Sequence, residues 1–385
     1  MEEAYKVALA CLPGMNTLAL PKLLRLAGGA ETLWGTLAKG GERAKALVGA
    51  EKALVWVEAC RCADPLQVLK ELERKGIKAV TPAHDCFPDR LNAIYDPPAL
   101  LFMRGENPPE DAPYVAVVGS RKASSYGRWA AETIGGELAR RGVVVLSGAA
   151  YGVDGHAHQG CLKAGGFTIA VLGCGIDRVY PPEHTGLLRR IASSGCLLSE
   201  YPPGDEPLPW HFPHRNRIIA GLSHAVVVVE AAEKSGALIT ADLALEDGRE
   251  VMAVPGPIGS PLSQGTNGLI QKGAKLVMGV EDVCEELPCE LVRCAVNGKG
   301  EGSRADMEAG EDIDPLERKC LGLLLGEPRR LDWLATMAEI STGELLACLT
   351  SMSIKGWVAE EAGGRYRLLI NPSCRKNQSS HNNKI

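Results

Sequence analysis

Glycine-rich turns that carry serine and arginine hold the residue types best suited to binding phosphate. The first reads Gly119-Ser120-Arg121-Lys122, and it separates a run of strand length from a helical segment that opens at Ser124. A helix N-terminus offers free N–H donors and a positive dipole end, while Ser120 and Arg121 add a hydroxyl and a guanidinium fork. We predict an anion-binding turn here. An ordinary strand-to-helix turn with a solvated arginine is the alternative.

Two further turns of the same kind follow later runs of strand length. One reads Ser147-Gly148-Ala149-Ala150-Tyr151-Gly152-Val153-Asp154, and the other reads Gly173-Cys174-Gly175-Ile176-Asp177. The carboxyl ends of parallel strands meet at one edge of a sheet, where the ligands of open α/β sheets bind. Three such turns on one edge therefore predict an elongated trough rather than a point site.

A fourth loop, Trp210-His211-Phe212-Pro213-His214-Arg215-Asn216-Arg217, combines positive charge with aromatic rings. Arg215 and Arg217, separated by the amide of Asn216, suit the phosphates of a nucleic-acid backbone. The scarce aromatic residues are concentrated in these same loops, namely Tyr151, Tyr180, Tyr201, Trp210 and Phe212. Bases stack on such rings with a gain of about 1 to 3 kcal/mol each. Solvated arginines beside core aromatics are the alternative.

Composition limits where such a site can lie and what else the chain can be. The 42 basic and 47 acidic residues give a net charge of −5, which excludes binding of polyanions by bulk charge. No apolar run approaches the ~18 to 20 residues of a membrane span, and the opening Met1-Glu2-Glu3 is acidic, so we expect a cytoplasmic protein without membrane contact. The 13 cysteines read as buried apolar residues in a reducing compartment. Cys284, Cys289 and Cys294 have no histidine nearby, so we expect no metal site.

Familiar enzyme signatures do not fit the sequence. No GxGxxG follows the first strand of the sheet, and neither GxxxxGK[ST] nor GxSxG occurs. Asp154 and His158 stand four residues apart, a spacing that more often gives a hydrogen bond at a helix start than half of a catalytic relay. We therefore expect no catalytic residue and no cofactor.

The elements that position these loops are visible as continuous apolar runs alternating with segments of helical period. The runs are Val115 to Gly119, Val143 to Ser147, Thr168 to Leu172, Cys196 to Ser199, Ala225 to Glu230, Glu250 to Val254 and Lys275 to Met278. Continuous rather than alternating hydrophobicity is typical of strands buried on both faces. One intervening helix is expected to have an apolar face of Tyr126, Trp129, Ala130, Thr133, Ile134 and Leu138. Strands and helices in alternation predict an α/β fold with a parallel sheet and right-handed crossovers.

Segments of different character flank this sheet domain, which we place at 76–284. Residues 1–75 are predicted to be helical, with a turn at Leu12-Pro13-Gly14-Met15-Asn16 that resembles a helix-hairpin-helix or is a plain αα-corner. The acidic, glycine-rich stretch 285–311 predicts a flexible linker, and the polar tail 371–385 is predicted to be disordered.

Residues 312–370 predict three helices and a hairpin, an arrangement that resembles a winged helix. A capping box at Ser341-Thr342-Gly343-Glu344 starts the third helix. That helix carries Glu344 and no basic residue before Lys355, whereas groove reading requires arginine or lysine at base edges. We favour a protein-contact or regulatory role over DNA reading.

Taken in order, these motifs resemble the DNA-processing protein A (DprA/Smf) family. The motifs are Val117-Val118-Gly119-Ser120-Arg121, Ser147-Gly148 through Asp154 and His158, Ala170-Val171-Leu172-Gly173 with Asp177 and Tyr180-Pro181, Ser199-Glu200-Tyr201-Pro202-Pro203-Gly204, Phe212-Pro213 with Arg215-Asn216-Arg217-Ile218-Ile219-Ala220-Gly221-Leu222-Ser223, Glu230-Ala231 with Ser235-Gly236, and Ala253-Val254-Pro255-Gly256. The resemblance implies an extended Rossmann-like domain flanked by a SAM or helix-hairpin-helix-like module and a winged-helix-like domain. It also implies a dimer that binds single-stranded DNA and hands it to the recombinase RecA during natural transformation.

The resemblance assigns roles to individual residues. Arg121, Arg215 and Arg217 would contact phosphates, Ser147 and Gly148 would give backbone contacts, and Phe212 would lie beside a base. The full set expected to bind DNA is Ser120, Arg121, Lys122, Ser147, Gly148, Tyr151, Trp210, Phe212, Arg215, Asn216 and Arg217. Leu269 and Ile270 are expected at the dimer interface.

Two positions depart from the family pattern, and a second function stays open. His184 stands where the family commonly has asparagine, a minor change in a surface turn, and the acidic loop 206–210 replaces a basic residue, with Trp210 compensating by stacking. The alternative function is that of a nucleotide-binding enzyme of the lysine-decarboxylase-like phosphoribohydrolase type. Pro255-Gly256-Pro257-Ile258 does not supply the PGGxGT loop which that class requires.

Overall fold

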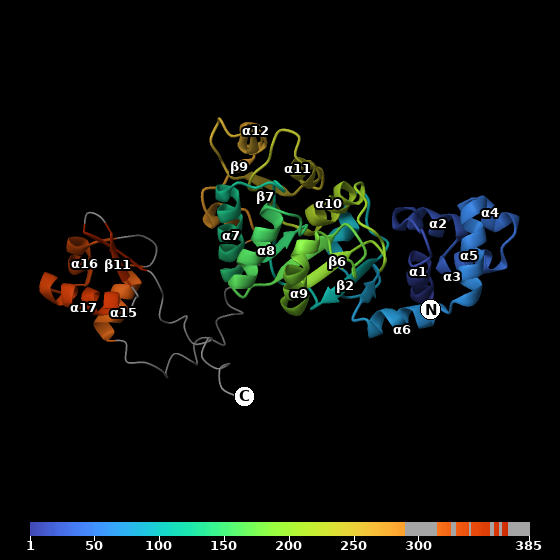
Figure 1. Cartoon of the computed structure of the whole chain (residues 1–385), viewed down its shortest axis with the longest axis horizontal. Coiled ribbons are helices and arrows are strands. Elements are labelled where there is room, and N and C mark those ends of the chain that lie inside the picture. The colour runs from blue at the N-terminus through green and yellow to red at the C-terminus, as the bar shows by residue number, and fades with distance from the viewer. Residues whose placement is uncertain (289–313, 325–328, 339, 355–357, 362–363, 369–385) are drawn as a thin grey trace. The chain divides into compact units, whose positions relative to one another are not determined.

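The computed structural model describes residues 1–288, 314–324, 329–338, 340–354, 358–361 and 364–368. The chain divides into two compact units, residues 1–303 and residues 304–385 (Figure 1). The part of the expected linker beyond residue 288 lies outside the described residues, and the same holds for the whole expected tail. Cys289 and Cys294 also lie outside them. Within the described ranges no group of histidine, cysteine, aspartate and glutamate side chains is arranged to hold a metal ion.

A nine-stranded sheet forms the centre of the first unit. Its strand order is β1-β2-β6-β5-β4-β3-β7-β8-β9. The strands are β1 Lys78–Val80, β2 Leu101–Gly105, β3 Tyr114–Val118, β4 Val144–Ser147, β5 Thr168–Leu172, β6 Cys196–Ser199, β7 Ala225–Val228, β8 Glu250–Ala253 and β9 Lys275–Leu276. Strands β3 to β9 pair in parallel, which confirms the predicted α/β sheet. The antiparallel pairs β1–β2 and β2–β6 extend one edge and were not predicted.

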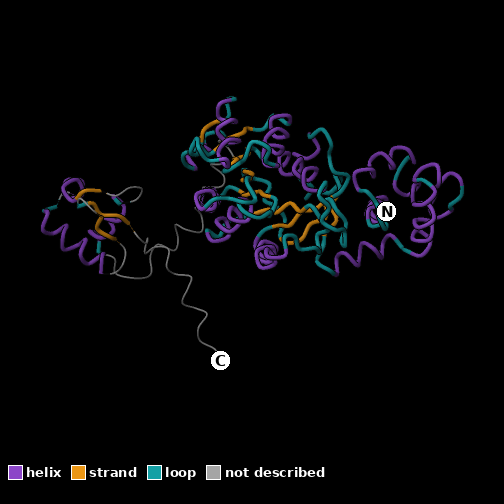
Figure 2. The backbone as a smooth tube through the Cα atoms, turned by 45° about the horizontal axis from the view of Figure 1, so that its top comes forward, coloured by secondary structure: helices purple, strands orange, loops and turns teal. Residues whose placement is uncertain are grey.

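Helices cover both faces of the sheet, so the strands lie between helical layers (Figure 2). These helices are α7 Ser125–Arg140, α8 Val153–Lys163, α9 Thr185–Ser194, α10 His211–Leu222, α11 Gly236–Glu246, α12 Gln264–Gln271 and α13 Val280–Cys284. Val115 and Val117 of β3 belong to the core beneath α7 and α8, whereas Ala116 and Val118 belong to the core beneath α10 and α11. Because successive side chains point to opposite faces, burial on both faces explains the continuous apolar runs.

A helical module precedes the sheet. It contains α1 Glu2–Ala10, η1 Thr17–Ala19, α2 Leu20–Ala27, α3 Ala30–Lys39, α4 Glu42–Val48, α5 Ala50–Cys62 and α6 Pro65–Arg74. The indole N–H of buried Trp56 donates to the carbonyl of Pro13 at 2.8 Å and so fixes the expected turn after α1. The module shares one apolar core with the sheet domain, and Thr81 donates to the Glu3 carboxylate at 3.0 Å.

Short 3-10 helices occur in three connections of the sheet domain. They are η2 Asp89–Ala93, η3 Pro182–His184 and η4 Pro261–Ser263. None of the helices described in either unit is both long and apolar enough to cross a bilayer.

The described residues of the second unit form three helices and a small sheet, as predicted. Its elements are α15 Pro315–Leu323, β10 Arg329–Arg330, α16 Leu331–Ala338, α17 Thr342–Ile354, β11 Val358–Glu361 and β12 Arg365–Leu368. The strands pair in the order β10-β12-β11, so one strand joins the predicted hairpin. The Ser341 hydroxyl accepts from the Glu344 N–H and the Glu344 carboxylate accepts from the Ser341 N–H, which confirms the predicted capping box.

Candidate nucleic-acid interface

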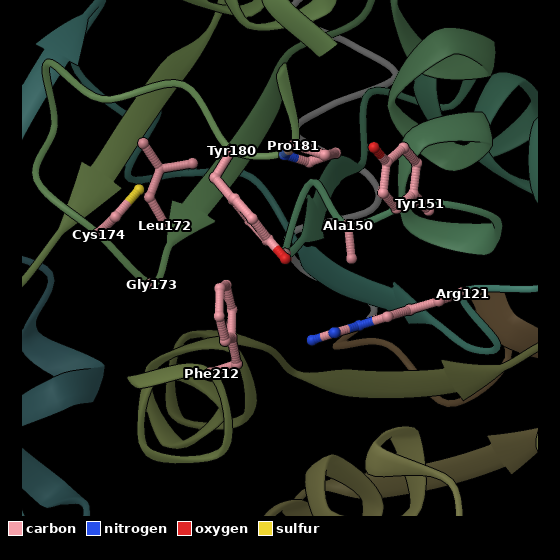
Figure 3. A pocket seen from close by; sticks show the side chains of 10 residues that line it. Arg121, Ala150, Tyr151, Leu172, Gly173, Cys174, Tyr180, Pro181 and Phe212 are labelled. Atoms are coloured by element: carbon pink, nitrogen blue, oxygen red, sulfur yellow. The ribbon is translucent and has the colours of Figure 1, made fainter. Parts of the chain in front are cut away.

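A pocket lies at the carboxyl ends of the central strands (Figure 3). The three predicted loops that follow β3, β4 and β5 meet there with the fourth, which forms the first turn of α10. It is lined by Arg121, Gly148, Ala150, Tyr151, Leu172, Gly173, Cys174, Tyr180, Pro181 and Phe212. Arg121, Gly148, Tyr151 and Phe212 belong to the set expected from the sequence, and the structure brings them together. Tyr180 was recognised as a loop aromatic but was left out of that set.

Arg121, Phe212 and Tyr180 lie close together in this pocket. The Arg121 guanidinium lies 5.1 Å from the centre of the Phe212 ring, and the rings of Phe212 and Tyr180 are 5.2 Å apart. Figure 3 shows the three side chains pointing toward a common space. Arg121 is exposed, and within the described ranges its side chain has no hydrogen bond or ion pair. The pocket therefore presents a cation without an ion-pair partner among the described residues, beside two aromatic rings inclined by 38°.

Gly173 makes the position of the Phe212 ring possible. A Cβ at residue 173 would lie 2.9 Å from Cδ1 of Phe212, closer than ordinary van der Waals contact permits. The turn Gly173-Cys174-Gly175 therefore contributes space for the Phe212 ring at this edge of the sheet, rather than free N–H donors for a ligand.

Tyr151 closes the opposite side of the pocket. Its hydroxyl donates to the Glu183 carboxylate, a bond that raises the pKa of the phenol to about 12. Its ring packs edge-on against His184 at 5.5 Å, and Nδ1 of His184 lies 3.0 Å from the Ala149 carbonyl. His184 therefore supports Tyr151 from behind without lining the pocket itself.

Arg215 lies under the pocket rather than in it. Only 4% of the residue is exposed. Its guanidinium donates to the carbonyls of Gly148, at 3.0 Å, and Val171, and thus ties the end of β4 to that of β5. Burial lowers the pKa of this guanidinium to about 10. The expectation that Arg215 contacts phosphate is wrong because the side chain is buried and its Nε and Nη1 donate to the protein itself.

Asp154 supports the same loop from the first turn of α8. Its carboxylate accepts from the N–H groups of Gly148, at 3.1 Å, and Ala150, at 3.4 Å. Between them Ala149 has a φ of 52°, a conformation that non-glycine residues rarely adopt without support. The Gly148 N–H is therefore not free for a ligand. His158 bonds elsewhere, with its Nδ1 2.7 Å from the Thr168 hydroxyl.

Arg217 is also withdrawn from solvent. It is 8% exposed, and its Nη2 donates to both oxygens of the buried Glu200 carboxylate at 2.8 and 2.7 Å. Its Nε lies 3.2 Å from the Asp96 carboxylate. The expected phosphate contact is therefore wrong for Arg217 as well. The Asn216 amide accepts from Arg215 at 3.2 Å and lies 3.5 Å from the Gly236 carbonyl.

The predicted anion site at the start of α7 is already filled. The Glu230 carboxylate, which is almost wholly buried, accepts from the Ser124 N–H at 2.8 Å and from the Ser124 hydroxyl. The Ser120 hydroxyl accepts from the Lys122 N–H at 3.1 Å, and the Ser147 hydroxyl donates to the Val117 carbonyl at 2.7 Å. An internal anion thus replaces the expected phosphate, and the serines stabilise turns.

Lys122 and Trp210 stay available at the surface. The Lys122 side chain is exposed and forms no hydrogen bond or ion pair with any described residue. Trp210 is half-exposed beside His211 and does not line the pocket.

The expected dimer residues lie elsewhere and are less accessible. Leu269 of α12 is 7% exposed and belongs to the apolar core that also contains β7 and β8. Ile270 packs partly buried against that core. Leu269 therefore packs inside the domain, and its place at a dimer interface stays a prediction.

Known protein families match both units. The family described as DNA recombination-mediator protein A matches residues 78–288, and the DprA winged helix domain matches residues 304–364. The chain is 44% identical over 223 residues to the DNA processing protein DprA of Bacillus subtilis, which covers 58% of this chain and 75% of the relative. It is 35% identical over 332 residues to the protein Smf of Synechocystis, covering 79% of this chain and 83% of the relative.

A solved structure agrees with the observed fold. The X-ray structure of DNA processing protein A from Streptococcus pneumoniae is 38% identical, has a TM-score of 0.61, and covers 74% of this chain and 98% of its own. The first match spans more than half of the chain and contains the nine-stranded sheet with the whole pocket. The chain therefore belongs to the DNA recombination-mediator protein A family, whose members are also named DprA or Smf.

Proposed function

We propose that this recombination mediator binds single-stranded DNA at the pocket formed by Arg121, Tyr180 and Phe212. The observation that carries the proposal is the Arg121 guanidinium, which lies over the Phe212 ring without a carboxylate partner among the described residues. A phosphate oxygen can accept from this guanidinium, and the adjoining base can stack on the exposed ring faces. Duplex DNA offers no unstacked base for such rings, so a single strand fits the site best.

Binding at this pocket is expected to be independent of sequence. Every base has a π-face that can stack on Phe212 or Tyr180, and a guanidinium reads phosphate rather than base edges. A mediator that accepts any incoming strand requires this tolerance. Its affinity should depend on salt, because each phosphate contact releases a counterion.

The family relationship supports wider roles, which we propose together with this site. The protein would protect incoming strands and load the recombinase RecA onto them during natural transformation, acting as a homodimer in the cytoplasm. No bond of the DNA is broken in this scheme, so the protein is a binding protein rather than an enzyme. The family match favours this function over the phosphoribohydrolase alternative.

Filter binding with an oligothymidylate tests the site. Arg121→Ala should lower the affinity severalfold because the cation of the pocket is lost. Arg189→Ala, which removes an exposed arginine of α9 outside the pocket lining, is the matched control and should bind as the wild type does. Equal affinity of all three proteins would refute the site. Release of free base from nucleoside monophosphates would revive the enzymatic alternative.

A further inference from the structure

Tyr126 and Trp129 form an exposed aromatic pair at the start of α7. They are 43% and 63% exposed, and their rings lie 6.0 Å apart with planes inclined by 36°. The expectation from the sequence that both lie on the buried face of this helix is wrong. Ala130, Ile134 and Leu138 form that face instead. The two rings are therefore not used by the core.

The pair is held in place by its surroundings. The Tyr126 hydroxyl donates to the Pro255 carbonyl at 3.3 Å, which anchors one ring to the loop after β8. Arg128 lies along the same turn, where its guanidinium donates to the Ala123 carbonyl at 2.7 Å and the Ser125 hydroxyl at 3.2 Å. Rings that are already ordered lose little conformational entropy when a ligand stacks on them.

The electrostatic surroundings of the pair favour a polyanion. Between Gly119 and Ala131 the chain carries Arg121, Lys122 and Arg128 and no acidic residue, although the whole protein has a net charge of −5. The Glu230 carboxylate reaches this segment from β7, but its oxygens are engaged by Ser124 and it is almost wholly buried. Glu132, the nearest acidic residue along the helix, is paired with Lys163. Exposed rings beside the Lys122 side chain, which is unpaired among the described residues, suit unpaired nucleotides better than an apolar protein segment.

The pair also follows the pocket residue Arg121 closely along the chain. Arg121 lines the pocket, Lys122 follows it, and the first turn of α7 with Tyr126 begins within the same loop. A strand whose phosphate is bound by Arg121 can therefore leave the pocket along Lys122 toward these rings.

We propose that Tyr126 and Trp129 form a second stacking platform, on which single-stranded DNA continues after leaving the pocket. The platform rests on the proposed function, since it requires a strand already bound at Arg121. Its occupants are unpaired bases of any sequence, and Lys122 and Arg128 lie beside their phosphates. It makes the binding site longer than the pocket alone.

Oligonucleotide length separates the platform from the pocket. We compare oligothymidylates of about 4 and about 16 nucleotides, the span of site sizes typical of single-strand binders. Trp129→Ala should weaken binding of the longer oligonucleotide by about fivefold or more, the loss expected for one stacked base, and leave the shorter one unchanged. Trp129→Phe, which keeps a ring, should retain most of the affinity. Tyr95→Ala, which removes a fully exposed tyrosine of another loop, is the control.

The variants distinguish failure of the platform from failure of the pocket. If Arg121→Ala weakens both oligonucleotides but Trp129→Ala binds both as the wild type does, the platform is refuted and the pocket stands. If Arg121→Ala changes neither, the proposed function itself fails. A changed sedimentation coefficient in Trp129→Ala with unchanged DNA affinity would show that the rings contact another protein copy, and would overturn the platform.

Discussion

The guanidinium of Arg121 lies 5.1 Å from the centre of the Phe212 ring, although 91 positions separate the two residues in the chain. Arg121 follows β3 and Phe212 lies in the first turn of α10, so the contact joins a loop to the start of a helix at the carboxyl edge of the sheet. The aromatic face attracts the cation without neutralising it. The guanidinium therefore keeps its donors for a phosphate while its position is fixed.

Phe212→Ala should weaken binding of single-stranded DNA by about 1 to 3 kcal/mol, because it removes a stacking surface. It also removes the ring that positions Arg121. Phe212→Tyr keeps the ring and should bind as the wild type does. Filter binding measures both, and unchanged affinity in Phe212→Ala would show that no base contacts this residue.

Gly173→Ala tests the packing beneath the ring. The added methyl would meet Phe212 at 2.9 Å and displace the ring, so DNA affinity should fall several-fold while the chain stays folded. Gly186→Ala places the same methyl where no atom lies within 4 Å and serves as the control. An affinity equal to that of the control would mean that the ring position does not matter for binding.

Arg215→Met separates support of the pocket from contact with DNA. Removal of a buried guanidinium leaves the carbonyls of Gly148 and Val171 without their donor, so the free energy of unfolding should fall by about 1 to 3 kcal/mol for each. The salt dependence of DNA binding should not change, because no phosphate contact is lost. Arg215→Lys provides a milder variant for the same two measurements, urea unfolding and salt titration. If Arg215→Met were as stable as the wild type but its DNA affinity depended less steeply on salt, Arg215 would contact the DNA.

The buried imidazole of His158 should make the free energy of unfolding depend on pH. Burial lowers the pKa of its imidazole to about 3, below the usual value near 6.5. Between these values the unfolded chain binds a proton that the folded chain does not, so stability falls as pH decreases from about 6.5 toward 3. Urea unfolding at neutral and mildly acidic pH should show a smaller loss for His158→Asn than for the wild type. Equal losses in His158→Asn and the wild type would contradict the assignment.

Leu269→Arg should destabilise the domain rather than dissociate an oligomer. The new charge would be buried against β7 and β8, at a cost of about 3 to 5 kcal/mol in the free energy of unfolding. Gln271→Arg, at an exposed position of the same helix, should unfold as the wild type does. A normally stable Leu269→Arg with a smaller sedimentation coefficient would instead place this residue at an interface.

The parallel sheet could be predicted because its signal is local. Val115 to Val118 are apolar without alternation, and burial on both faces requires that pattern wherever the segment pairs. The capping box at Ser341 was predictable for the same reason, since both partners lie within four residues.

Which charged side chains are buried and paired could not be predicted, because their partners come from distant segments. Glu230 fills the start of α7 across 106 positions, and Arg215 reaches Gly148 across 67. The sequence showed arginines in a loop, but only the packing of α10 on the sheet determines which of them face inward. Arg121 differs because no carboxylate among the described residues approaches it.

The salt dependence of DNA binding by Arg121→Ala tests the central claim most directly. For the wild type, the logarithm of the affinity should fall linearly with the logarithm of salt concentration, with a slope of about −0.7 for each single-strand phosphate contacted. Arg121→Ala should bind more weakly and with a slope shallower by about 0.7, because one contact is lost. A slope identical to that of the wild type would contradict the claim that this guanidinium binds phosphate.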